Sequence, residues 1–390
     1  MAGTSMNSTD HITHFHIDKF KSLHKFAIPF PSSPNNTFLC LIGKNGSGKS
    51  TVLQAVDFAG EIFRGKISHW LMSRNLKKRD ISSFQRLQNI NLDIEGCFNG
   101  HTVNWSSSFN IQQLRCTQEK IRIDGNTVFS VTDGKYRFFG ENEVKNIFTY
   151  EGSILSILDK EILESKGLAA FCAFMKKMYS FDTLNSKQLR MRTRPVDTDT
   201  NIGRGGEFLS GKIATFSAGQ IKELITRVRE FYPWIINIYT SSLRGGWKEL
   251  FFVEKSADGS THRFSSQNSC DGLLRLVGFL TEFMTSDTFI VFDEIENGFN
   301  PEIMEKLVRM ITDFPTQIII TTHNPVIINY MQEDIAIEST LLVYRKQDGT
   351  TGIRRFFEIP EVSERLSYLS PGEVFLDVDI DDVLSNAESA

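Results

Sequence analysis

The stretch Gly43–Thr51, GKNGSGKST, constrains the fold of this chain more than any other part of its sequence. An apolar run, residues 38–42, leads directly into it, and the residues after it, STVLQAVDFAGEIF, are apolar at roughly helical spacing. Glycines allow successive backbone N–H groups to surround one anion, and a helix N-terminus adds partial positive charge. A strand, a glycine loop and a helix in this order therefore predict a phosphate-binding loop within an α/β fold.

Two side chains of this loop have a predicted role of their own. Lys49 supplies a full positive charge to the outer phosphates of a nucleotide, and Ser50 offers its hydroxyl to Mg²⁺, so the expected cofactors are ATP and Mg²⁺. A glycine-rich turn without function is the alternative, and the flanking strand and helix argue against it. The predicted nucleotide-binding residues are Gly43, Lys44, Asn45, Gly46, Ser47, Gly48, Lys49, Ser50 and Thr51.

The composition of the chain restricts its possible partners, whereas its length restricts little. With 390 residues the chain can bury a large core. Its 43 Lys and Arg against 47 Asp and Glu give a formal charge of −4, so any contact with nucleic acid has to be local. The five cysteines are scattered without a CxxC pair, which is typical of a reducing cytosol and argues against structural zinc. The sequence holds no apolar run of about 18 residues, and we expect a cytoplasmic protein without a membrane partner.

Periodicity divides the chain into four predicted segments. The first, 11–152, starts with strand, turn and strand, and its alternating pattern between residues 89 and 139 predicts antiparallel sheet. The second, 153–245, is mainly helical in pattern, and we interpret it as an insertion. The third, 246–355, returns to short apolar runs typical of buried parallel strands, and the last, 356–390, is a C-terminal tail. The predicted fold is a mixed sheet around the phosphate loop with an antiparallel β subdomain and a helical insertion.

The predicted helices of the insertion rest on apolar spacing alone. They are ILSILDKEILES at 154–165, LAAFCAFMKKMYSF at 168–181 and GQIKELITRVREFYPWI at 219–235. Beyond the insertion, a further helix is expected to start after Asn300, where a proline follows.

Two adjacent carboxylates follow the apolar run FIVF in the sequence FIVFDEIENG. Hydrolysis of a nucleoside triphosphate needs one carboxylate for the metal and a group that orients the attacking water. Asp293 is predicted to hold Mg²⁺, directly or through its water, and Glu294 to act as the general base. Glu296 competes for the base role, and a solvated acidic loop is the alternative for the pair.

His323 follows the next apolar strand, thirty positions after Asp293. An imidazole at a strand end can bond the terminal phosphate of a nucleotide and respond to its loss. A lone histidine is more often a packed or surface residue, so the prediction of a catalytic His323 depends on the two preceding motifs.

The phosphate loop, the Asp-Glu pair and the strand-end histidine resemble, in this order, the ABC-type P-loop ATPases, and within them the branch of RecF, Rad50 and the SMC proteins. The opening FHIDKFKSL is similar to the first strand of that branch with its Phe-Lys/Arg-Ser turn, and GKNGSGKST is similar to its NGSGKS loop. DEIENGFNP resembles the DEIENGLHP form of the OLD-like members. The resemblance covers the two ATPase halves and leaves the insertion aside.

The resemblance also implies a signature motif, which places a Ser and a Gly at a helix N-terminus upstream of Asp293. SCDGLLRLVGFL fits, with Ser269 24 residues before Asp293 and Gly272 three residues further on. Cys270 and Asp271 depart from the common LSGGQ wording. In the family, such residues contact the terminal phosphate held by a second subunit, so the site is completed only in a dimer. On the residues alone, Ser269 or Asp271 can equally be a helix cap.

Two further features, Asn300 and the Q-loop glutamine, each have two interpretations, and a third rests on the resemblance alone. Asn300 matches the position of the family's D-loop aspartate but is also a good helix start. The family's Q-loop glutamine has two candidates here, Gln88 and Glu151. The resemblance alone implies that Lys21 and Ser22 approach the nucleotide.

Two basic runs and an acidic tail have no assigned chemistry. KQLRMRTRP, residues 187–195, and LKKRD near Lys77 can grip phosphate backbones or form solvated surface, and the absence of base-stacking aromatics favours the surface. VFLDVDIDDVL, residues 374–384, favours an edge strand or a docking tail over a nuclease site, because too few residues remain for a toprim fold.

The resemblance implies an ATP-driven switch in which two heads sandwich ATP and hydrolysis opens them. The expected assembly is a homodimer or a higher homo-oligomer. Stand-alone ATPases of this kind resemble subunits of bacterial anti-phage systems of the Septu and PARIS types, where a separate toprim or HNH nuclease chain is held or released and nucleic acid or a phage protein is the trigger. The rival classes are a DNA-repair or DNA-clamp ATPase and an assembly scaffold that binds ATP without useful turnover.

Overall fold

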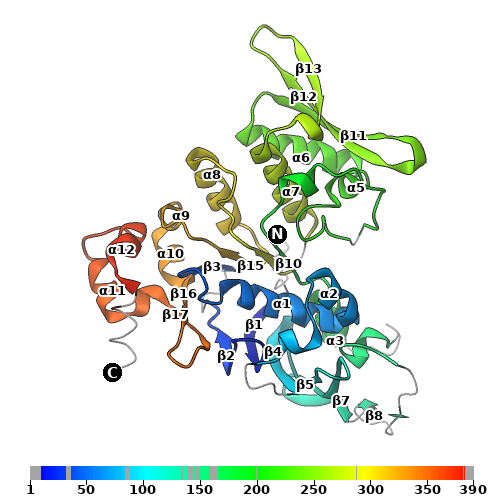
Figure 1. The fold of residues 1–390 in the computed structure, drawn as a ribbon, viewed down its shortest axis with the longest axis vertical. Coiled ribbons are helices and arrows are strands. Elements are labelled where there is room, and N and C mark those ends of the chain that lie inside the picture. Colours follow the sequence, from blue (N-terminus) through cyan, green and yellow to red (C-terminus); the bar gives the residue numbers. More distant parts are fainter. Residues whose placement is uncertain are drawn as a thin grey trace, which may run out of the picture. The chain divides into compact units, whose positions relative to one another are not determined.

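The chain folds into two compact units in the computed structural model (Figure 1). The first comprises Met1–Ser180, Thr288–Val291 and Ile311–Ala390, and the second comprises Phe181–Asp287 and Phe292–Met310. Within them the structure describes residues 10–31, 37–83, 88–132, 135–138, 144–145, 149–158, 166–198, 200–286, 288–380 and 382.

An antiparallel sheet forms a large part of the first unit, with strand order β2-β1-β4-β5-β6-β7-β8-β9. Its strands are β1 (His11–Asp18), β2 (Phe26–Ile28), β4 (Asn89–Phe98), β5 (His101–Asn110), β6 (Arg115–Ile123), β7 (Asn126–Thr132), β8 (Lys135–Phe138) and β9 (Val144–Lys145). Every second residue of β4 is buried, as alternation in the sequence predicts for a sheet with one packed face. The antiparallel β subdomain is therefore confirmed.

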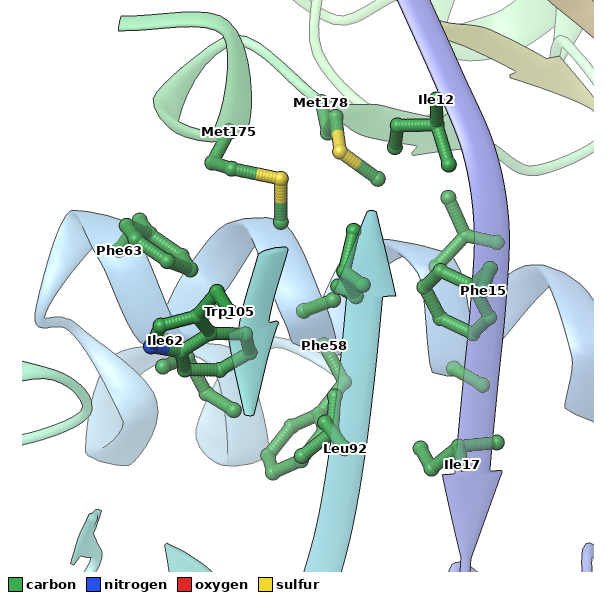
Figure 2. Close-up of a cluster of buried hydrophobic side chains, with 14 of the residues drawn as sticks. Ile12, Phe15, Ile17, Phe58, Ile62, Phe63, Leu92, Trp105, Met175 and Met178 are labelled. Carbon is green, nitrogen blue, oxygen red and sulfur yellow. The ribbon is translucent and has the colours of Figure 1, made fainter. Parts of the chain in front are cut away.

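The packed face of this sheet is covered by helices. They are α1 (Lys49–Arg64), α2 (Ile67–Ser73) and α3 (Lys166–Lys176). The 3₁₀ turn η1 (Lys78–Ile81) follows α2, and η2 (Ile154–Ser156) precedes α3. Figure 2 shows Phe58 and Phe63 of α1 among side chains of β1, β4 and β5. The ring of Phe63 lies edge-on to Trp105, with 4.8 Å between centroids. Aromatic burial of this kind anchors α1, and with it the loop that precedes α1.

A second sheet of the first unit contains the strand that leads into the phosphate loop. Its order is β10-β14-β15-β3-β16-β17. The strands are β3 (Phe38–Ile42), β10 (Tyr179–Phe181), β14 (Ile290–Phe292), β15 (Ile318–Thr321), β16 (Thr340–Arg345) and β17 (Thr351–Arg355). β3 is buried along its whole length and pairs in parallel with both β15 and β16, while β17 runs antiparallel to β16. The mixed sheet around the phosphate loop is therefore confirmed as well.

The second unit is not purely helical. Its helices are α4 (Ser186–Leu189), α5 (Leu209–Ile213), α6 (Ala218–Phe231) and α7 (Asp271–Thr285), and α8 (Pro301–Thr312) starts in it. A three-stranded sheet follows α6, with β11 (Ile235–Ser242), β12 (Lys248–Lys255) and β13 (Thr261–Ser265), and 3₁₀ turns η4 (Arg244–Gly246) and η5 (Ser266–Asn268) flank β12 and α7. Ser217 and Gln220 form a capping box that starts α6, so the third predicted helix of the insertion is confirmed in its main part.

The predicted helix 168–181 is wrong at its C-terminal end. α3 stops at Lys176, and Tyr179–Phe181 form strand β10. The guanidinium of Arg64 donates to the carbonyl oxygens of Lys176 (3.0 Å) and Met178 (2.7 Å) and lies over the ring of Tyr179. A distant side chain thus satisfies the carbonyls at the helix end, which the local pattern cannot reveal. Of the predicted helix 154–165, the described residues form only the turn η2, and 159–165 lie outside them.

The expectation of an edge strand in the C-terminal tail is also wrong. The described residues of the tail form η6 (Phe356–Glu358), α11 (Pro360–Arg365) and α12 (Pro371–Asp377), and residues 381 and 383–390 lie outside the described residues. Before the tail, α9 (Val326–Asn329) and α10 (Glu333–Ser339) lie between β15 and β16 in the chain. Ser370 and Glu373 form a capping box and a proline occupies the first turn, so α12 has strong start signals. Among the described residues, no helix has the length and apolar character that crossing a membrane requires.

Glu119 of β6 is fully buried in the first unit and carries a testable consequence. Its carboxylate accepts hydrogen bonds from Trp105 Nε1 (3.1 Å), Ser153 Oγ (2.5 Å) and the Ile154 amide (3.0 Å). Burial nevertheless dominates and raises the pKa of Glu119 to about 7. Because the unfolded chain ionises near 4.5, ionisation favours unfolding between these values, and stability is lost as the pH rises through them.

We therefore expect Glu119→Gln to remove this pH dependence. Relative to the wild type, the free energy of unfolding of the variant should rise by up to about 3 kcal/mol between pH 5 and pH 8. Urea unfolding at both pH values measures it, with Glu230→Gln on the exposed side of α6 as the matched control. Parallel pH profiles for Glu119→Gln and the wild type would contradict the assignment.

Candidate nucleotide site

The phosphate loop of the first unit requires glycine for steric reasons. Gly43 has φ +147° and Gly48 has φ +112°, conformations that other residues rarely adopt. A Cβ on Gly43 would lie 2.1 Å from the Val343 carbonyl oxygen of β16, and one on Gly48 would lie 2.3 Å from Thr351 Oγ1 of β17. The loop is therefore shaped by the neighbouring hairpin as well as by its own sequence.

Lys49 is the first residue of α1 and is buried in this loop. Its Nζ donates to the carbonyl oxygens of Gly43 (2.7 Å) and Lys44 (3.2 Å). Ser50, the next residue, is exposed in the first turn of the helix. An ammonium and a helix N-terminus suit a polyphosphate, and a hydroxyl oxygen is a ligand that Mg²⁺ accepts, so the residues present fit ATP and Mg²⁺.

The Lys21-Ser22 turn lies beside the phosphate loop. Ser22 Oγ is 2.8 Å from Thr351 Oγ1, the same atom that a Cβ on Gly48 would meet. Lys21 Nζ donates to Gln54 Oε1 on α1 (2.6 Å), and burial lowers the pKa of Lys21 to about 8. The turn is thus close to the loop through side-chain contacts on both sides.

His323 follows β15 in the first unit and is exposed. The Thr322 amide donates to the Leu41 carbonyl (3.1 Å), which extends the pairing of β15 with β3 past the end of the strand. Because β3 and β15 are parallel, the phosphate loop and His323 leave the sheet at the same edge. This common edge agrees with the predicted role of His323 at the terminal phosphate.

Asp293 and Glu294 follow β14 and belong to the second unit. The Asp293 amide donates to the Phe181 carbonyl (3.1 Å). Glu294 has φ +49°, a strained conformation for a residue with a Cβ, and its Oε2 accepts hydrogen bonds from Asn297 Nδ2 (2.5 Å) and Thr183 Oγ1 (3.3 Å). The carboxylate that the sequence predicts as general base is therefore held in one orientation by two donors.

The signature segment lies at the start of α7 in the second unit. Ser269 is buried, and α7 begins at Asp271 with Cys270 as its N-cap. Within the described residues Cys270 makes no side-chain capping bond, and neither Ser269 nor Asp271 occupies the cap, so the helix-cap alternative is wrong for both. A Cβ on Gly272 would lie 2.8 Å from the hydroxyl of Tyr232. By contrast, Asn300 Oδ1 accepts from the Ile303 amide (3.0 Å), which confirms its interpretation as a helix start.

Two family matches divide the chain in the way its motifs do. Residues 11–193, with the phosphate loop, match the family described as "AAA ATPase domain". Residues 215–329, with Ser269, Asp293, Glu294 and His323, match the family described as "AAA domain, putative AbiEii toxin, Type IV TA system". The chain is a P-loop ATPase of the ABC type.

The fold of this ATPase is similar to that of solved SMC heads. One is the SmcHead bound to the C-winged helix domain of ScpA, with 13% identity, a TM-score of 0.52, and coverage of 88% of this chain and 97% of the other. Another is the Smc head domain with an extended coiled coil bound to the C-terminal domain of ScpA, from Pyrococcus furiosus, with 12% identity, a TM-score of 0.50, and coverage of 92% and 100%. At this identity the likeness concerns the fold. No curated protein matches the sequence of the ATPase.

Sequence reasoning missed Thr183, the residue that bonds the predicted general base. It lies two residues past β10, the neighbour of β14 in the sheet order. Of the two Q-loop candidates, Glu151 accepts from the Ser68 amide (2.7 Å). The adjacent Gly152 packs on the Ile62 carbonyl, and 13 residues of α1 (62 minus 49) place this point about 20 Å from Lys49. Glu151 is thus remote from the phosphate loop, while the exposed Gln88 precedes β4.

Three arginines of the basic run 187–195 contact other residues of the second unit. Arg190 forms an ion pair with Asp271 (2.7 Å) and Arg192 with the buried Glu249 (3.0 Å), and Arg194 lies over the ring of Trp247. The arginines therefore hold neighbouring elements together. Neither of the two interpretations from the sequence, binding of phosphate backbones or a solvated surface, predicts this role. In the run near Lys77, Lys78 Nζ donates to the Gln112 carbonyl (2.7 Å).

Lys49→Ala is expected to weaken ATP binding by roughly 10- to 100-fold, because a charge-assisted bond to phosphate is worth about 1.5–3 kcal/mol. Titration calorimetry with ATP measures the change. Lys222→Ala removes the same charge from the exposed side of α6 and is the control expected to bind ATP normally. Equal affinities for the two variants would contradict the predicted role of Lys49.

Proposed function

We propose that this chain hydrolyses ATP with Mg²⁺ as a nucleotide-driven switch, and that each active site forms between two copies. The observation that carries the proposal is the presence, in one chain, of a phosphate loop with a buried lysine and of a signature segment at a helix start. In the ABC type, the second element serves the nucleotide of another subunit, so a chain with both supports a symmetric dimer.

In the proposed reaction each residue has a separate task. Lys49 and the loop amides bind the outer phosphates, and Ser50 and Asp293 are oxygen donors suited to Mg²⁺, which supplies charge neutralisation when bound. Glu294 accepts a proton from the attacking water, with its carboxylate oriented by Thr183 and Asn297. His323 bonds the terminal phosphate and loses this bond after hydrolysis.

Glu294→Gln tests both hydrolysis and assembly. The amide still offers an oxygen to Thr183 and Asn297 but cannot take a proton, so we expect unchanged ATP affinity and hydrolysis slower by about 100-fold or more. The variant should accumulate as an ATP-bound dimer, which light scattering after gel filtration measures. Normal turnover would eliminate Glu294 as the base, and a monomer with bound ATP would eliminate the composite site.

We further propose that the switch is the sensor or regulator subunit of an anti-phage defence complex. Its output would be a separate nuclease chain of the toprim or HNH type, and its trigger nucleic acid or a phage protein. The second family's description, which names a toxin of a toxin–antitoxin system, supports a role of this kind. A test is to co-express the chain with the adjacent reading frame and to compare co-purification with ATP and with ADP. A neighbour that never co-purifies, or that encodes no nuclease, would count against it.

The likeness to SMC heads favours a second candidate, a DNA-clamp or DNA-repair ATPase. Hydrolysis stimulated several-fold by DNA would support it over the defence role. The internal bonds of Arg190, Arg192 and Arg194 weigh against run 187–195 as its DNA grip.

A further inference from the structure

One short segment of the second unit contacts both the predicted general base and the signature segment. At its start, Thr183 Oγ1 donates to Glu294 Oε2. At its end, Arg190 Nη2 donates to the Ser269 carbonyl (2.6 Å) and to Asp271 Oδ1 (2.7 Å). The eight-residue segment 183–190 therefore connects the predicted base to the residues on both sides of Cys270.

The segment between these contacts is firmly held. The side chain of Asn185 caps α4 and accepts from the backbone amides of Lys187 and Gln188. The backbone amide of Asn185 donates to the Gly205 carbonyl (2.9 Å). Leu184 and Leu189 are buried and pack where Gly278 of α7 leaves room for them. The segment is thus fixed against the same helix whose N-terminus it contacts.

Arg190 connects this segment to residues 269–272 of the signature segment, which we call the signature loop. Its Nη1 donates to the Ser186 carbonyl (2.9 Å), and its backbone carbonyl accepts from Gln267 Nε2 (2.6 Å), so both the side chain and the backbone of Arg190 are held. The hydroxyl of Ser186 and the guanidinium of Arg190 lower the pKa of Asp271. The N-cap Cys270 makes no side-chain capping bond within the described residues, whereas Arg190 makes charge-assisted bonds to the residues on both sides of it.

We propose that Arg190 is a positioning residue, which holds Ser269 and Gly272 in the orientation needed to bind the terminal phosphate on a second copy of this chain. The assignment rests on the proposed function. It makes Arg190 act in trans, on the partner's ATP, while the same segment holds Glu294 for the chain's own ATP. The bond from Arg190 to the Ser269 carbonyl sets the path of the loop. The planar guanidinium of arginine, with several donors in a fixed arrangement, suits this role better than the single ammonium of lysine.

The first experiment compares Arg190→Ala with Lys187→Ala, which removes a charge from the exposed side of the same short helix. Arg190→Ala should bind ATP as the wild type does, since its phosphate loop is intact, but turn over about 100-fold more slowly because the signature loop is displaced. Arg190→Lys should recover part of the loss, and Lys187→Ala should behave as wild type. Wild-type turnover in Arg190→Ala would overturn the proposal.

The second experiment separates action in trans from a defect in folding. Lys49→Ala lacks the phosphate loop's charge but keeps the signature loop, and Arg190→Ala has the opposite defect. Mixed dimers of the two contain one intact site, so a 1:1 mixture should recover about a quarter of wild-type activity although each variant alone retains only a few per cent of it or less. A mixture that stays inactive would overturn action in trans.

The wild type distinguishes this inference from the proposed function. If wild-type protein neither hydrolyses ATP nor dimerises with it, the proposed function fails and the role of Arg190 fails with it. If wild-type protein does both and the two variants do not complement, the proposed function stands and only the role of Arg190 fails.

Discussion

The close approach of the β16–β17 hairpin to the phosphate loop is the constraint on which the rest of the site depends. The Val343 carbonyl and the Thr351 side chain leave no space for a Cβ on Gly43 or Gly48, and the two glycines provide the positive φ angles with which the chain leaves β3 and enters α1. Lys49 then lies in the loop with its ammonium directed at backbone carbonyls. Any residue larger than glycine at position 43 or 48 would therefore have to push the loop away from this hairpin.

In the second unit, hydrogen bonds from neighbouring side chains hold Glu294 and the start of α7 in place. Glu294 is kept in a strained backbone conformation by Thr183 and Asn297, and the Asn297 carbonyl accepts from Arg275 of α7 (2.7 Å). Arg190 supplies the corresponding tie at the signature loop. Arginine suits these positions because one guanidinium can satisfy several acceptors at once.

Local signals in the sequence predicted the elements whose determinants are close together along the chain. The alternation in β4 and the capping box before α6 are examples, as are the apolar runs β3 and β15. Prediction failed where a distant residue decided the outcome. Arg64 ends α3 more than a hundred residues away, so Tyr179–Phe181 become a strand, and the partners of the arginines in 187–195 lie on elements that the sequence places far downstream.

The sequence by itself determined which chemical groups this protein has available: a glycine loop that can cradle phosphate, two carboxylates after a buried strand, and a histidine after the next one. These depend on residue types at short spacing, which a sequence displays directly. Only the tertiary structure decided which side chains hold those groups in place. Neither Thr183 nor Arg190 belongs to a catalytic motif, because a hydrogen bond acts over about 3 Å in space and is indifferent to the number of residues between its partners. Asn297 lies within DEIENGFNP, but the motif does not reveal its bond to Glu294.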